Sequence, residues 1–128
     1  MPARKRSLAD DTGSAPVEFV LVGLLLTALT LGVIQLGVAV YVRNVVHDAA
    51  ITGAHQAALA DETVGAGVDR TRELIRRAIG AAYAGEITGR SNADTVEMVV
   101  RAPLPVIGLW GPAGAMEVRG HAPRETLE

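Results

Sequence analysis

The feature that most constrains this chain is an uncharged apolar run of 24 residues, residues 19–42. A helix rises about 1.5 Å per residue, so the run would cover roughly 36 Å, enough for a hydrocarbon core of about 30 Å. The alternative is a core helix of a soluble protein, but the rest of a 128-residue chain could not bury such a helix on all sides. The run is therefore predicted to span a membrane once.

Composition narrows the function classes. Only 3% of the residues are aromatic, so the part beyond the span lacks the large side chains that usually fill a core. The net charge of -2 gives no basic footprint for phosphates, and nucleic acid is not an expected partner. The absence of cysteine excludes disulfides and thiolate metal sites.

The flanks of the apolar run predict its orientation. Arg4, Lys5 and Arg6 precede it, whereas only Arg43 follows it closely. Positive residues favour the cytoplasmic side, so we expect a cytoplasmic N-terminus and an extracytoplasmic C-terminal domain. The small-residue triplet 58–60 lies too far beyond the run to act as a signal-peptidase site.

One carboxylate, Glu18, stands at the N-terminal edge of the run. An ionised carboxylate beside hydrocarbon is costly and usually has a partner. A Glu in the headgroup region, favoured by the positive end of the helix dipole, is also common and needs no function. Taken alone, Glu18 leaves both interpretations open.

The spacing around Glu18 resembles the processing site of type IV prepilins. Gly13 is followed five residues later by Glu18, then by Phe19 and the apolar run. In that family a membrane aspartyl peptidase cuts after the glycine on the cytoplasmic side. The resemblance implies a cut between Gly13 and Ser14 that removes the basic leader, residues 1–13. The new ammonium at Ser14 would lie one helical turn from Glu18, which could neutralise its own terminus or that of a neighbour.

Further segments extend the resemblance to the TadE-like family of minor pilins (pseudopilins) of the tight-adherence, Flp-type pilus system. They are the processing segment 13–19, Gln35-Leu36-Gly37, Tyr41-Val42-Arg43-Asn44, the alanine-rich stretch after it, and residues 101–112. The resemblance implies an inner-membrane or pilus-associated subunit. Its implied partners are the lipid bilayer, a prepilin peptidase and other pilin-like subunits of the assembly machinery.

Beyond the span, small residues recur at helical spacing. Ala49, Gly53 and Ala57 fall four apart, as do the residues that follow each of them, so the first helix should continue to about residue 60 with a surface that another helix can approach closely. Two partners remain open for this helix-packing face. It could receive other pilin-like helices, or it could be covered by the chain's own C-terminal domain.

A second, amphipathic helix is predicted over residues 68–83, where apolar residues form a stripe at helical spacing. Its Arg70, Arg72, Arg76 and Arg77 could contact lipid headgroups or a partner, but such charges are usually the solvated face of the helix.

Residues 95–101 alternate as a half-buried strand does, and Pro103 ends the pattern. A Pro- and Gly-rich loop with the only tryptophan, Trp110, then leads to a second short strand, residues 115–121. Trp110 could anchor the loop or contact the membrane interface or a partner. The expected fold is α+β and pilin-like: a cytoplasmic leader 1–13, a membrane helix with its extension 14–60, and a small domain 61–128 that ends in an antiparallel hairpin.

We expect no enzyme, cofactor or metal site. His47, His55 and His121 lack the spacing of metal ligands, and no nucleophile elbow or phosphate loop is present. The leading hypothesis is a TadE-like minor pilin cleaved after Gly13. The alternatives are an uncleaved single-pass scaffold subunit of an envelope or secretion complex, and a tethered binding module that uses Trp110 and the arginine-rich helix.

Overall fold

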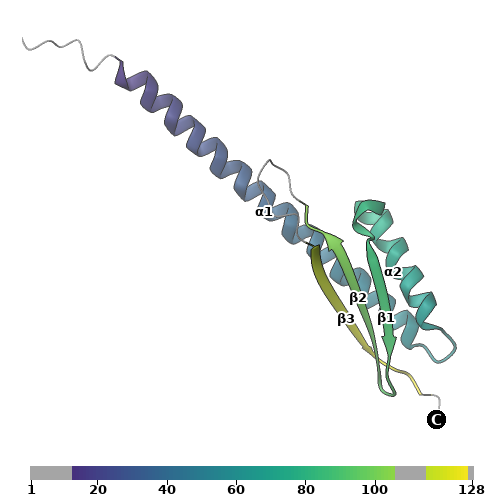
Figure 1. Cartoon of the computed structure of the whole chain (residues 1–128). Coiled ribbons are helices and arrows are strands. Elements are labelled where there is room, and N and C mark those ends of the chain that lie inside the picture. The colour runs from purple at the N-terminus through teal and green to yellow at the C-terminus, as the bar shows by residue number, and fades with distance from the viewer. Residues whose placement is uncertain (1–12, 106–114, 127–128) are drawn as a thin grey trace, which may run out of the picture. The chain divides into compact units, whose positions relative to one another are not determined.

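The structure is a computed structural model that describes residues 13–105 and 115–126 (Figure 1). Its elements are α1 (Ser14–Ala58), α2 (Val64–Ile79), the 3-10 turn η1 (Ala81–Tyr83), and the strands β1 (Glu86–Ser91), β2 (Thr95–Pro103) and β3 (Ala115–Pro123). The chain divides into two compact units, Met1–Ile34 and Gln35–Glu128, so α1 contributes residues to both.

The first unit contains the N-terminal half of α1, in which every residue from Ser14 to Ile34 is exposed. A window of this helix reaches a mean hydropathy of 2.4, and its length and composition suit a membrane span. The hydroxyls of Thr27 and Thr30 donate to the carbonyls of Gly23 and Leu26 at 2.8 Å, so these polar groups are satisfied within the helix. One exposed apolar helix of this kind indicates a single-pass membrane protein.

In the second unit, α1 turns one face toward the protein core. Apolar residues at three- and four-residue spacing put their side chains on the same side of a helix, and here that side is buried. The buried residues are Val42, Val46, Ala49, Ala50, Gly53, Ala54, Ala57 and Ala58. α1 ends at Ala58, within two residues of the predicted end.

The three strands form one antiparallel sheet in the order β1-β2-β3. β2 and β3 confirm the predicted hairpin and extend it by two residues at the C-terminal end of each strand. Successive residues alternate between the two faces, and one face packs on the helices. The inward side chains of these two strands are Val96, Met98, Val100, Ala102, Met116, Val118 and Ala122. β1 is an additional strand that the sequence did not predict, paired with β2 through Thr88↔Val99.

α2 begins four residues before its predicted start. Thr63 caps it, because its hydroxyl accepts a hydrogen bond from the backbone N–H of Ala66 at 3.1 Å. The helix stops before Gly80, whose φ of 101° lies in the left-handed region that favours glycine. The remainder of the predicted helix becomes η1.

α1 and α2 approach each other through two glycines. A Cβ on Gly67 would lie 2.5 Å from the carbonyl oxygen of Gly53 and 2.6 Å from the Cβ of Ala57, so no larger residue fits there. Thr71 is buried beside them, and its hydroxyl donates to the carbonyl of Gly67 at 2.9 Å. The low helix propensity of Gly65 and Gly67 explains why the sequence pattern placed the start of α2 too late.

Candidate processing and membrane-anchoring site

The candidate processing site lies at the first residue of α1. Gly13 is exposed, immediately precedes Ser14, and has no heavy atom within 4 Å of a Cβ built on it. The peptide bond between Gly13 and Ser14 therefore lies at the helix boundary, where the backbone is not enclosed by other parts of the described chain.

Ser14, Glu18 and Phe19 lie on the first two turns of α1. Because the helix begins at Ser14, Glu18 is four residues along and lies on the same helical face. Glu18 is exposed, and Phe19 keeps 80% of its surface exposed. Pro16 falls in the first turn, where its missing N–H has no intrahelical acceptor to lose. The structure thus places all four residues of the predicted motif together at the exposed end of the helix.

The predicted helix-packing residues lie elsewhere on α1, inside the second unit. Ala49, Gly53 and Ala57 are buried, and a Cβ on Gly53 would meet the Thr71 hydroxyl and the Gly67 carbonyl. The hydroxyl of Thr71 also donates to the carbonyl of Ala49 at 3.4 Å. Of the two partners that the sequence left open, the structure places the chain's own domain on this face.

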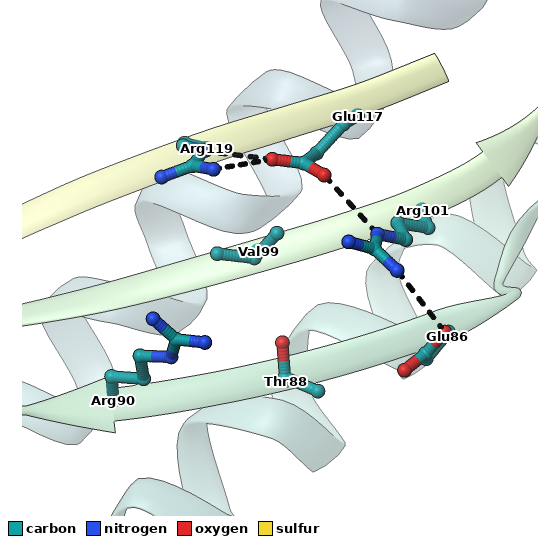
Figure 2. A pocket seen from close by; sticks show the side chains of 7 residues that line it. All are labelled: Glu86, Thr88, Arg90, Val99, Arg101, Glu117 and Arg119. Atoms are coloured by element: carbon teal, nitrogen blue, oxygen red, sulfur yellow. Dashed lines mark hydrogen bonds and ion pairs between the residues drawn. The ribbon is translucent and has the colours of Figure 1, made fainter. Parts of the chain in front are cut away.

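A second polar region, which sequence analysis missed, lies on the outward face of the sheet (Figure 2). We call it the charged sheet face: Glu86, Arg101, Glu117 and Arg119, with Thr88, Arg90 and Val99, around a shallow hollow of about 220 Å³. Arg101 lies 3.1 Å from Glu117 and 4.0 Å from Glu86, and Arg119 lies 2.6 Å from Glu117. The two pairs of Arg101 join β2 to β1 and to β3, whereas Arg119 and Glu117 lie two residues apart on β3.

The electrostatics of the charged sheet face follow from these pairs. Hydrogen bonds from Arg119 and then Arg101 lower the pKa of Glu117, and the hydrogen bond to Glu117 raises the pKa of Arg119. All three side chains remain solvated, so the pairs stabilise the sheet only modestly. Alternating charges along each strand were the available signal, but Glu86 could not be placed without β1.

Three of the four arginines of α2 pair with acidic residues of the same helix. Arg72 lies 3.3 Å from Asp69, and Arg76 lies 2.9 Å from Glu73, to which Arg77 also binds. Desolvation alone would raise the pKa of Glu73, but Arg76 and Arg77 outweigh it and lower the value. This pattern of i,i+3 and i,i+4 pairs suits a solvated helix face.

Other candidates from the sequence carry no site in the described part of the chain. His121 lies 3.4 Å from Glu97, but neither it nor His47 or His55 belongs to a metal-binding cluster of three or more His, Cys, Asp or Glu within residues 13–105 and 115–126. Trp110 and most of the leader lie outside the described residues.

Comparison with known proteins bears on the N-terminal half of the chain. Residues 13–55 match the model of a family described as TadE-like protein. The match begins at Gly13, contains Glu18 and the whole apolar run, and ends before α2. No curated protein and no solved structure matches the chain.

Proposed function

We propose, from the match of residues 13–55 to the TadE-like family model, that the chain is a minor pilin (pseudopilin) processed by a prepilin peptidase. In this proposal it takes part in the assembly of an Flp-type, tight-adherence pilus. The observation that carries the proposal is the position of Gly13 and Glu18, five residues apart at the exposed start of an apolar helix. The family match begins at the same glycine.

The prepilin peptidase would cut the bond between Gly13 and Ser14, which lies at the exposed start of α1. The peptidase removes residues 1–13 and leaves an ammonium at Ser14, while the helix stays in the bilayer. Glu18 then neutralises an ammonium, either its own or that of the next subunit. Neutralisation matters because an ionised carboxylate beside hydrocarbon is costly and usually has a partner.

The orientation of the proposed subunit rests on charge. Arg4, Lys5 and Arg6 favour a cytoplasmic N-terminus in the inner membrane, which would put Gly13 on the side where prepilin peptidases cut. The residues that follow the apolar run would then lie on the extracytoplasmic side.

The proposed contacts with other pilin-like subunits run through the exposed half of α1. Its side chains from Phe19 to Ile34 are apolar or small, and nothing in the described chain covers them. The small-residue face further along is occupied by α2 and the sheet, so it is not available to a neighbour. The proposal therefore assigns assembly to the same stretch that spans the lipid.

The test is the intact mass of the membrane-extracted full chain, produced with and without a prepilin peptidase. We expect a peptidase-dependent N-terminus at Ser14 that is lost in Gly13→Leu. Gly23→Leu is the matched control, because Gly23 lies in the same exposed helix with no heavy atom within 4 Å of an added Cβ, and it should be cleaved normally. The Glu18→Ala variant should be cleaved, but fewer pilin-like subunits should co-purify with it than with the parent chain.

A leader that remains intact with the peptidase present would contradict the proposal. The chain would then be an uncleaved single-pass scaffold subunit of an envelope or secretion complex, for which Glu18 is dispensable.

A further inference from the structure

Exposed apolar side chains continue along α1 past the point where the helix enters the domain core. Leu36, Val40 and Tyr41 keep 66%, 51% and 58% of their surface exposed. On the opposite face Val42 is only 4% exposed, and Val38 packs against the same core. Over this stretch, α1 therefore has one apolar face on its own domain and another apolar face that no part of the described chain covers.

The length of the apolar run sets the depth of this stretch in a bilayer. Residues 19–42 cover roughly 36 Å as a helix, whereas a bilayer with its headgroup regions is about 40–45 Å thick. Both ends of the run therefore fit inside the lipid layer. Tyr41 is a residue type that favours the membrane–water interface, and the first charge after the run is Arg43. Tyr41 and Val42, at the end of the run, thus belong at the interface, and Leu36 lies about 8 Å deeper, toward the acyl chains.

The end of the sheet at which β3 begins lies close to the end of the apolar run, measured along the axis of α1. A Cβ on Gly120 would lie 2.5 Å from the backbone nitrogen of Ile51, and the N–H of Glu125 donates to the carbonyl of Ala58 at 3.0 Å. The five residues from Gly120 to Glu125, which follow the direction of β3 past its end, thus advance along about seven residues of α1. By the same ratio Ala115, the first residue of β3, lies level with about residue 43–44 of α1.

Leu104 lies at this end of the sheet. It follows Pro103, which pairs with Ala115, and 39% of its surface is exposed. Continuing the strand direction by one residue brings Leu104 to about the level of residue 42, which is the end of the apolar run. The exposed side chain of Leu104 therefore lies at about the same depth as Tyr41, at the membrane–water interface.

We propose that this end of the domain is seated in the lipid interface, through a contact surface formed by Leu36, Val40 and Tyr41 of α1 together with Leu104. The domain is not held clear of the bilayer, because its core begins at Val42, within the apolar run itself. The occupant of the surface is the boundary between headgroups and acyl chains. The inference rests on the membrane span alone and requires neither cleavage after Gly13 nor pilus assembly.

The chain has no cysteine, so single cysteines can report on depth. Leu104→Cys probes the proposed surface, Tyr41→Cys is the positive control on the span, and Asn92→Cys is the matched control. Asn92 is exposed in the turn between β1 and β2, at the end of the sheet that lies beside Ala58. Each full-length variant carries an environment-sensitive fluorophore and is placed in phosphatidylethanolamine–phosphatidylglycerol nanodiscs that contain lipid with a nitroxide near the headgroup.

We expect the nitroxide lipid to quench the fluorophore at Leu104→Cys almost as strongly as at Tyr41→Cys, and several-fold more strongly than at Asn92→Cys. Pro103→Cys, an exposed neighbour at the same level, should give the same result and guards against a local effect of the leucine substitution. Quenching at Tyr41→Cys with none at Leu104→Cys or Pro103→Cys would overturn the inference and leave the span intact. No quenching at Tyr41→Cys would overturn both the inference and the membrane premise of the proposed function.

Discussion

Replacement of Gly53 by alanine should separate α1 from α2. An added Cβ would meet the hydroxyl of Thr71 and would lie 2.6 Å from the carbonyl oxygen of Gly67. The hydroxyl can rotate, but it would have to leave its acceptor, and the backbone carbonyl can move only if α2 moves with it. The domain therefore accommodates the new methyl group only by opening the helix pair.

The size of the effect follows from three contributions. Alanine in a helix interior is favoured over glycine by about 1 kcal/mol. Overpacking of a close contact costs about 1–3 kcal/mol, and a buried hydroxyl displaced from its acceptor costs about 1–3 kcal/mol more. We expect a net loss of about 3 kcal/mol in the free energy of unfolding of the domain. At about 1.4 kcal/mol per factor of ten, that is roughly a 140-fold rise in the opening equilibrium.

Hydrogen exchange of the β2 amides in the full chain, held in detergent micelles, measures this rise directly. The matched control is Gly65→Ala in α2, where the added Cβ would have only the Thr63 hydroxyl nearby, at 3.7 Å. That variant should exchange as slowly as the parent or more slowly. If the β2 amides exchanged as slowly in Gly53→Ala as in Gly65→Ala, the close contact between the helices would not exist and the reasoning would fail.

Three further changes test other parts of the domain. Met98→Ala removes a fully buried side chain and should cost about 2–5 kcal/mol in urea unfolding; a loss below about 1 kcal/mol would mean that the core is not packed as described. Thr63→Ala removes the cap of α2 and should cost about 1 kcal/mol, seen as faster exchange in the first turn of that helix; unchanged exchange there would refute the cap. Glu117→Gln should slightly lower thermal stability at pH 7. Because the pKa of Glu117 is lowered in the folded state, its contribution is present above the unfolded value and is lost as pH falls below 4.5 through the folded value, so melting curves of parent and variant should converge in acid. A constant difference between them at all pH values would show that the ion pairs are not its cause.

The elements that depend on local periodicity could be predicted from the sequence. The uncharged run gave α1, the small residues at four-residue spacing gave its extension, and alternation gave β2 and β3. β1 could not be predicted because it contains Gly89 and only one buried apolar residue, Ile87. Gly89 is needed there, since a Cβ would clash with Val64 and lie 3.1 Å from Met98. That requirement comes from residues distant in sequence and leaves no local pattern.

Part of the candidate site could likewise be predicted from local sequence, and part of it could not. The spacing of Gly13 and Glu18 is local, so the motif was found from the sequence, and the structure adds that both residues are exposed at a helix start. The partner of Ala49, Gly53 and Ala57 could not be predicted, because a small-residue face looks the same whether a neighbouring chain or the chain's own domain covers it. Only the positions of Gly67 and Thr71 decide between the two.

The position of β3 has a consequence for the order of events during biosynthesis. β3 begins at Ala115, yet it packs against Ala50 and Ile51, which the ribosome makes much earlier. The core therefore cannot close until β3 has been made, and contacts between such distant segments form slowly. The buried face of α1 thus waits for a strand that is synthesised long after the helix itself.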